Sequence, residues 1–446
     1  MKTEHWRFGR SALALGLISL IALGSATPGV NAFADEETKR TPLAGEQGGP
    51  PLGIRALKIL TVTKGVIDNG LILIRDGMIA AVGTHVAAPG DTVFIDATDQ
   101  WVLPGMIDLH SHIGTAGRDI NDMALPTNPD LRILEALDPR SPELKDALTG
   151  GVTTILVIPG SGTNISGFGA LIKTAGDTLE DLVVRSPGAM KVAQGYNPER
   201  LGGDLGLTRM GMSWGLTHLL DEGKDYTDAW DAYEAGNVED APEFRPELEQ
   251  LKGLFRKEYP VIIHTAGARD VMSTIRMFND RYKLWTIISH ATFNGYRVAH
   301  EAAKRGMNIN LGPRQIDFRF AAKGTFIGLG AEYYKAGVEN LSINTDAPVV
   351  PQEDLFVQAA MAVRYGLDER AAIAAVTIRG AEAVGIADRV GSIEVGKEAD
   401  IVIRGGHPLD PRSSVDAVFI KGRLVYRRAD WEPSEGASLI ETIPTR

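Results

Sequence analysis

The chain has 446 residues, of which 44% are hydrophobic and 23% charged, with a formal net charge of −11 and no cysteine. This composition predicts a globular protein of one large domain or two smaller ones, and the acidic balance without a long basic run argues against a nucleic-acid partner. Without cysteine, no disulfide can form, and any metal must be held by nitrogen and oxygen ligands.

The N-terminal residues have the pattern of a targeting segment. A positively charged start is followed by an apolar run over residues 12–24 and by Ala-Phe-Ala at 32–34. This order is typical of a cleaved signal peptide, predicted here for residues 1–34, with Asp35 as the first mature residue. The alternative is an uncleaved membrane anchor. No later run is long and apolar enough to span a bilayer, so we expect an exported protein, periplasmic or secreted, without a stable membrane span after cleavage.

Both flanks of the remaining chain have a β pattern. Residues 35–53 are polar and end in a Gly- and Pro-rich stretch, which predicts a mobile leader. Short strands separated by turns follow over residues 54–100, including a hairpin turn at Asp76-Gly77. Similar strands return over residues 386–430, before a tail at 431–446. The simplest topology joins both parts into one small β-sandwich domain.

Residues 101–385 alternate strand-like and helix-like segments, which is the pattern of parallel βα units. Apolar residues spaced three and four positions apart predict helices at 246–257 and 295–305. Eight strands in about 250 residues are the size of a (β/α)8 TIM-type barrel. The expected strands are 102–109, 153–158, 170–174, 189–193, 261–263, 285–289, 307–311 and 341–344.

Polar side chains follow four of these strands where each strand ends. His110 and His112 end the first, His264 and His290 follow two later ones, and Asp346 follows the last. Positions two apart in a strand share a face, so His110 and His112 point the same way. A single histidine after an apolar run is more often structural. Five candidate ligands at the strand ends of one barrel predict a divalent metal site.

Three segments offer substrate contacts. The long stretch 202–237 is interpreted as a loop that forms a substrate lid, with His218 as a contact, or else as packed loop core. The Gly-rich stretch 160–169 lacks the ending of a phosphate loop and predicts a tight loop at the site mouth, with Asn164 facing substrate. Arg314 could pair with a substrate carboxylate, although such an arginine is equally often a surface charge.

The motifs Pro104-Gly-Met-Ile-Asp-Leu-His-Ser-His112 and Asn344-Thr-Asp-Ala-Pro348, with His264 and His290, resemble the amidohydrolase superfamily. The sequence is most similar to its imidazolonepropionase-like branch, and residues 390–403 resemble that family's return into its β domain. The resemblance implies a metal-dependent hydrolase with His110, His112 and Asp346 on the deeper metal. It also implies that His264 and His290 hold a second metal, or that one of them contacts substrate.

Two-metal members of that family carry a bridging carboxylate, often a carbamylated lysine, at the end of the fourth strand. Lys191 stands there among apolar residues, where an ammonium would be costly to bury. The alternatives are a lysine whose amine reaches solvent, or Lys173 on the third strand as the bridge. Zinc is the favoured ion because the ligands mix nitrogen and oxygen, and manganese or iron would also fit. One or two ions remain possible.

The expected reaction is hydrolysis of the C–N bond of an amide or cyclic amide in a small molecule. Hydroxide formed on the metal would attack a carbonyl polarised by metal or by a histidine, with His290 as the candidate. Asp346 would act as the proton shuttle. An exported metallo-dipeptidase of the same fold is the main alternative. A non-catalytic barrel scaffold predicts missing ligands, and none is missing. A homo-oligomer is left open.

Overall fold

The structure is a computed structural model and describes residues 41–115, 119–195, 197–199, 208–318 and 324–430. The predicted signal peptide and the predicted tail, residues 1–34 and 431–446, lie outside these ranges. Of the helices in the described ranges, none combines the length and the apolar character needed to cross a membrane.

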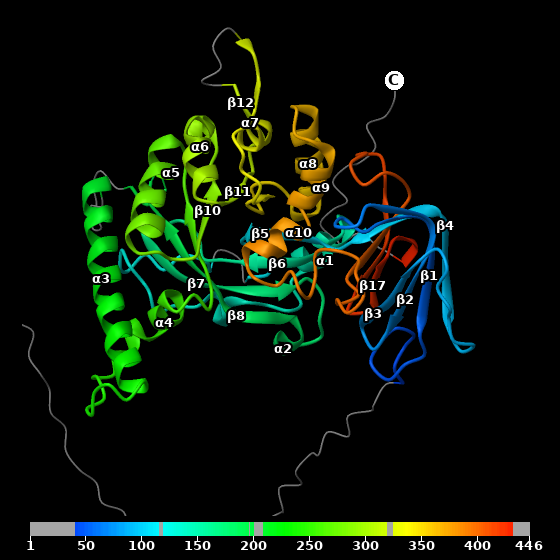
Figure 1. Ribbon diagram of the computed structural model, residues 1–446, viewed down its shortest axis with the longest axis horizontal. Coiled ribbons are helices and arrows are strands. Elements are labelled where there is room, and N and C mark those ends of the chain that lie inside the picture. Colours follow the sequence, from blue (N-terminus) through cyan, green and yellow to red (C-terminus); the bar gives the residue numbers. More distant parts are fainter. Residues whose placement is uncertain (1–40, 116–118, 196, 200–207, 319–323, 431–446) are drawn as a thin grey trace, which may run out of the picture. The chain divides into compact units, whose positions relative to one another are not determined.

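Within the described ranges, seven strands form one small sheet in the order β17-β16-β15-β4-β1-β2-β3 (Figure 1). Early and late strands meet where β4 pairs with β15, with Pro104 opposite Ile401. The two β-rich parts therefore join, but in one continuous sheet, where the sequence predicted a sandwich of two. The strands are β1 (Leu52–Leu60), β2 (Val66–Arg75), β3 (Met78–Gly83), β4 (Val93–Pro104), β15 (Ile401–Arg404), β16 (Val415–Ile420) and β17 (Arg423–Arg427).

The core of this sheet is aliphatic. Ile54 and Ile72, from the early part of the chain, and Phe419, from the late part, are buried in one cluster. Alternate residues of each strand face the same side, which brings these side chains together. Residues 42–51, predicted as part of a mobile leader, form turns bound to the β2–β3 hairpin. The amide of Gly77 donates to the carbonyl of Gly45 at 2.7 Å, and the amide of Gly48 donates to Asp76 at 2.8 Å.

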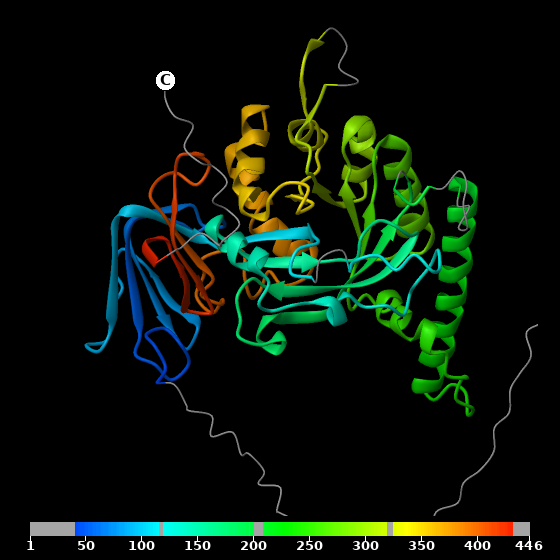
Figure 2. The same cartoon turned by 180° about the vertical axis from the view of Figure 1, so that it is seen from behind.

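Eight further strands of the described chain form a second sheet that nearly closes into a barrel (Figure 2). They match the eight predicted strands in order. The barrel closes between the segments that follow β5 and β14, where the amide of His112 donates to the carbonyl of Ala347 at 2.8 Å. The strands are β5 (Met106–Ser111), β6 (Val152–Val157), β7 (Ile165–Lys173), β8 (Val183–Ala193), β9 (Val261–His264), β10 (Thr286–His290), β11 (Asn308–Leu311) and β14 (Leu341–Ile343).

The barrel is mixed, so the prediction of all-parallel strands was wrong for β7. This strand pairs antiparallel with both β6 and β8. Only residues 158–164 connect β6 to β7, and a parallel crossover needs about a dozen residues or more. Residues 165–169, predicted as loop, start β7. Gly167 has a φ of +103°, and a Cβ there would lie 2.5 Å from the carbonyl oxygen of Leu131.

Helices cover the barrel between most of its strands. The stretch 202–237, predicted as a loop, is described from residue 208 and contains α3, the longest helix of the described ranges, which packs on α4 through Leu216, Leu220 and Leu251. The helices are α1 (Pro142–Thr149), α2 (Leu179–Leu182), α3 (Arg209–Glu234), α4 (Pro246–Phe255), α5 (Ala268–Thr274), α6 (Ala299–Lys304), α7 (Leu329–Lys335), α8 (Leu355–Arg364), α9 (Glu369–Ala375) and α10 (Ile378–Ala383). A short hairpin, β12 (Ile316–Asp317) and β13 (Ile327–Gly328), follows β11.

The two sheets are joined at Gly105. Residues 101–104, predicted as part of the barrel, extend β4, and β5 begins at Met106. A Cβ on Gly105 would lie 2.0 Å from the hydroxyl of Thr153, so the close approach of this connection to β6 requires glycine here. The Lys173 amine at the end of β7 also contacts Asp400 at 2.6 Å and Glu398 at 2.8 Å.

Candidate metal centre

The end of β5 presents His110 and His112 to the barrel interior. The strand is buried throughout, and Asp108 fixes its end. One Asp108 oxygen accepts from the amide of His110 at 2.9 Å, and the other accepts from the hydroxyl of Thr345 at 2.7 Å and from the amide group of Gln352 at 2.8 Å. Burial raises the pKa of Asp108 to about 6, and these hydrogen bonds oppose the rise. Asp108 thus ties β5 to the segment that carries Asp346.

The other three predicted ligands stand at strand ends around the same space. His264 ends β9, His290 ends β10, and Asp346 follows β14. His290 and Asp346 have φ values of +66° and +52°. Non-glycine residues seldom adopt this left-handed conformation, which costs on the order of 1 kcal/mol or more. The strain at both residues is concentrated at the site where their side chains turn inward.

The ligand atoms of these residues converge. One oxygen of Asp346 lies 3.3 Å from Nε2 of His110 and 3.4 Å from Nε2 of His112. Candidate ligand atoms of His110, His290 and Asp346 all lie within 4.8 Å of one another. The ring centroid of His290 is 4.3 Å from that of His110 and 4.4 Å from that of His264. The structure therefore brings all five predicted residues into one cluster.

Two histidines of the cluster use one ring nitrogen to contact a backbone carbonyl. The other nitrogen of each ring is turned inward. Nδ1 of His112 lies 2.8 Å from the carbonyl of Ile158, and Nδ1 of His290 lies 2.8 Å from the carbonyl of Gly312. A carbonyl can only accept, so each Nδ1 carries the proton and each Nε2 keeps a lone pair. Nε2 of His290 is buried without a hydrogen-bond partner. This donor set fits a divalent metal.

The electrostatics of the cluster favour neutral imidazoles. Burial, with the nearby charges of Lys191 and other histidines, holds the pKa of His110 and His264 well below the usual range. Burial also lowers the pKa of His290, against the attraction of Asp346. Burial would raise the pKa of Asp346, but its interactions with His112, His290 and Lys191 bring the pKa below its ordinary value. Neutral histidines and an ionised carboxylate are the forms that bind metal.

Lys191 lies at the end of β8 and is fully buried. Its amine is 3.2 Å from Nε2 of His110 and donates to the carbonyl of Pro159 at 3.2 Å. Burial lowers its pKa to about 7, while Asp346 opposes the shift. The alternative Lys173 is excluded as a bridge. Its strand is antiparallel, so its end lies at the other end of the barrel, paired with Glu398 and Asp400.

Two of the three predicted substrate contacts lie together. Asn164 and His218 line one cavity of about 300 Å³. His218 is on α3, where its ring stacks on Trp214 and contacts Glu222 at 3.5 Å. Arg314 lies elsewhere, after β11, with its guanidinium 4.8 Å from the ring centre of Phe293.

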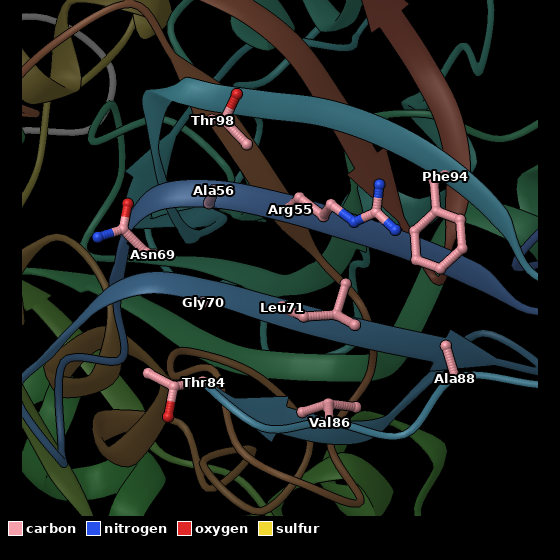
Figure 3. A pocket seen from close by; sticks show the side chains of 10 residues that line it. All are labelled: Arg55, Ala56, Asn69, Gly70, Leu71, Thr84, Val86, Ala88, Phe94 and Thr98. Atoms are coloured by element: carbon pink, nitrogen blue, oxygen red, sulfur yellow. The ribbon is translucent and has the colours of Figure 1, made fainter.

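A second cavity, of about 350 Å³, lies on the small sheet and has different chemistry (Figure 3). The guanidinium of Arg55 stands 4.0 Å from the ring centre of Phe94. The described residues that line it include no histidine and no carboxylate. This cavity is not part of the histidine cluster.

Sequence reasoning missed three residues that hold the cluster, namely Ser289, Asn310 and Asp108. The hydroxyl of Ser289 lies 2.6 Å from Nδ1 of His110, and Asn310 donates to the same hydroxyl at 3.3 Å. Asp108 lies within the motif at residues 104–112, but the sequence alone suggested no role for it. Its signal was an acidic residue inside a buried apolar strand, where a carboxylate needs several donors. Ser289 had no signal beyond its place before His290.

Comparisons with known proteins identify the family to which the chain is similar. Residues 244–425 match the amidohydrolase family. The chain is 27% identical over 80% of its length to amidohydrolase tasK of Hapsidospora irregularis, but spans only 40% of that protein. It is 24% identical to the imidazolonepropionase of Mesorhizobium japonicum, covering 76% of this chain and 87% of that one. A solved amidohydrolase from Thermotoga maritima has 30% identity and a TM-score of 0.77, over 84% of this chain and all of the other.

Proposed function

Because the chain belongs to the amidohydrolase superfamily, in its imidazolonepropionase-like branch, we propose that it is a metal-dependent hydrolase that cleaves an amide or cyclic amide bond in a small molecule. The family relationship supports a hydrolase that acts on C–N bonds. The observation that carries the metal dependence is the convergence of Nε2 atoms on Asp346, with the Nδ1 atoms of His112 and His290 held by backbone carbonyls.

The residues that would hold the ion are His110, His112, His264, His290 and Asp346. A bound divalent ion would supply a water whose pKa is lowered toward about 7. Zinc is the favoured ion because the ligand set mixes imidazole nitrogen with carboxylate oxygen.

Asp346 acts as the proton shuttle. Its lowered pKa keeps the carboxylate ionised at neutral pH, so it can accept a proton from the attacking water and return it to the leaving nitrogen. His290 is suited to the ligand role more than to polarising a carbonyl. Its Nδ1 carries the proton and donates to Gly312, so its Nε2 has no hydrogen to offer the substrate oxygen.

Lys191, as a carbamate, would add an oxygen ligand to this set. Because burial lowers its pKa to about 7, a substantial fraction of the amine is neutral at neutral pH. The neutral amine adds to carbon dioxide, forms an N–C bond and releases one proton, which gives an anionic carboxylate beside His110. This change replaces a costly buried ammonium with an oxygen ligand.

The test removes the metal from purified protein with a chelator and measures hydrolysis of N-acyl amino acids, lactams and dipeptides before and after zinc is restored. We expect loss of activity on chelation and recovery with zinc. Full activity of the metal-free protein in the presence of chelator would refute the proposal. Activity confined to dipeptides would favour the metallo-dipeptidase alternative.

We further propose that the protein is exported. The support is the basic start, the apolar run and the Ala-Phe-Ala sequence at 32–34. N-terminal sequencing of the exported protein should begin at or near Asp35. A mature chain that begins at Met1 would contradict a cleaved signal peptide.

A further inference from the structure

The cavity of about 300 Å³ beside α3 is a separate feature from the histidine cluster. It lies between the first half of α3 and the segment around Pro126. Trp214, Gly215, His218 and Leu219 line it from the helix, and Asn164 lines it from the loop before β7. Residues four apart on a helix share a face, so Trp214 lies beside His218 and Gly215 beside Leu219 in the wall formed by α3.

The loop of residues 158–164 connects this cavity to the metal ligands. The carbonyl of Ile158 accepts from His112, the carbonyl of Pro159 accepts from Lys191, and the hydroxyl of Ser161 lies 3.1 Å from Nδ1 of His264. Asn164, in the cavity wall, is three residues beyond Ser161. Three residues span at most about 10 Å, so the cavity lies within reach of a substrate bound at the cluster.

A second contact fixes the same wall. The amide group of Asn164 donates to the carbonyl of Ala193 at 2.7 Å, and Ala193 pairs with His264 in the register of β8 and β9. Asn164 is buried. The distance from the cavity to the cluster is therefore set by strands and does not depend on a loose loop.

The walls select the chemistry of an occupant. The Trp214 and His218 rings stack with centroids 5.2 Å apart and an interplanar angle of 11°, which makes a flat aromatic surface. Trp214 is nevertheless 70% exposed, although tryptophan side chains are highly buried on average. The carboxylate of Glu222 is engaged by His218 at 3.5 Å and by Arg245 at 3.4 Å. The wall therefore offers aromatic area and little unpaired charge.

We propose that this cavity binds a flat, uncharged aromatic side group of the substrate whose C–N bond is cleaved at the metal centre. The volume is at the lower end of the range for ligand pockets, so it fits one side group and not a whole substrate. Stacking on Trp214 and loss of water from its exposed ring stabilise the bound group. This inference rests on the proposed hydrolase function, because that function provides the neighbouring reaction.

The first test compares substrates that differ only in a phenyl or a methyl side group, within whichever of the three classes is hydrolysed. For wild-type protein, we expect kcat/KM to favour the phenyl substrate by about tenfold or more. Trp214→Ala should reduce this ratio to about one. Gly215→Leu should also reduce it, because a side chain at Gly215 grows into the cavity toward Asn164, whose oxygen lies 4.0 Å from the Cβ position. Metal content should not change in either variant.

Met210→Ala is the matched control. Met210 is on the same helix, 82% exposed, and outside the cavity lining, so its loss should leave the phenyl preference intact. A phenyl-to-methyl ratio near one in wild-type protein would overturn the proposal. An unchanged preference in both Trp214→Ala and Gly215→Leu would also overturn it.

Calorimetric binding of N-acetyl-phenylalaninamide and N-acetyl-alaninamide separates this inference from the proposed reaction. Tighter binding of the phenyl compound that is lost in Trp214→Ala supports the cavity assignment even if neither compound is hydrolysed. If hydrolysis is observed but binding shows no phenyl preference, the hydrolase function stands and the cavity assignment fails.

Discussion

Replacing Lys173 with methionine tests how the barrel is joined to the small sheet. The Lys173 side chain is 1% exposed, and its amine contacts Glu398 at 2.8 Å and Asp400 at 2.6 Å. Methionine keeps much of the volume but removes the charge, which leaves two buried carboxylates facing each other. Arg389 still pairs with Glu398, so only part of the network is lost. Removal of one partner from a buried ion pair costs about 3–5 kcal/mol.

The pH dependence of the unfolding free energy shows whether the lost ion pair causes the destabilisation. Burial would raise the pKa of Glu398, but Lys173 and Arg389 hold it below its ordinary value in the wild-type protein. A carboxyl with a depressed folded pKa contributes stability that is present above its unfolded pKa, about 4.3, and is lost as pH falls through the folded pKa. Without Lys173, this contribution is reduced. The difference in unfolding free energy between wild type and Lys173→Met should therefore be largest at neutral pH and shrink below about pH 4.

Urea unfolding followed by circular dichroism at several pH values measures this difference. At neutral pH, we expect the midpoint of Lys173→Met to fall by about 1 M or more. Lys335→Met is the control, because Lys335 pairs with Glu332 on the exposed surface of α7, and such pairs contribute about 0–1 kcal/mol. Equal small effects in both variants would refute the reasoning. A large loss of stability that does not change with pH would show that lost packing, and not the lost charge, is its cause.

Five further variants test the metal centre. His110→Ala or His112→Ala should abolish activity and reduce bound metal, and full metal content with full activity in either would contradict a ligand role. Asp346→Asn should lower turnover by about 10²-fold or more while metal content falls only in part, and near-normal turnover would exclude the proton shuttle. Lys191→Ala should lose metal and activity, with partial rescue by added propionate, whereas unchanged metal content and no effect of propionate would indicate a structural lysine. Ser289→Ala removes the partner of Nδ1 on His110 and should weaken metal affinity by about 10–100-fold, measured by competition with a chelator, while equal affinity would show that Ser289 does not orient the ring.

The sequence predicted the position of the barrel strands better than their direction. Runs such as Thr153–Ile158 are buried and apolar, and such runs identify strands whichever way the chain passes. The direction of β7 depends on the length of its connections. The glycines at 167 and 169 made the start of that strand look like a loop, although they permit close contacts with neighbouring backbone.

Helix α3 was missed because its stability comes from tertiary packing. Gly211, Gly215 and Gly223 lower its intrinsic helix propensity, and its aromatic residues suggested a lid. A Cβ at Gly223 would lie 2.6 Å from the Leu251 side chain, so this glycine permits the close approach of α4. A single sequence does not show that contact.

The predicted ligands could be found because each lies at or shortly after the end of an apolar run, and the barrel fold brings strand ends together. The residues that support these ligands could not be predicted. Asn310 and Ser289 act through hydrogen bonds between neighbouring strands, and their partners depend on register. Arg314 was a candidate only from its place after a strand, and it lies against aromatic rings.

The pairing of β4 with β15 has a consequence for synthesis. One edge of β4 stays open until Ile401 leaves the ribosome, about 300 residues after Pro104, which at 5–20 residues per second is roughly 15–60 s. During that time, a strand rich in unpaired backbone groups is exposed while the whole barrel is being made. A nascent chain stalled before β15 would carry this open edge into the crowded cell. We therefore expect such chains to aggregate or to bind chaperones, whereas chains stalled after Arg427 can complete the sheet.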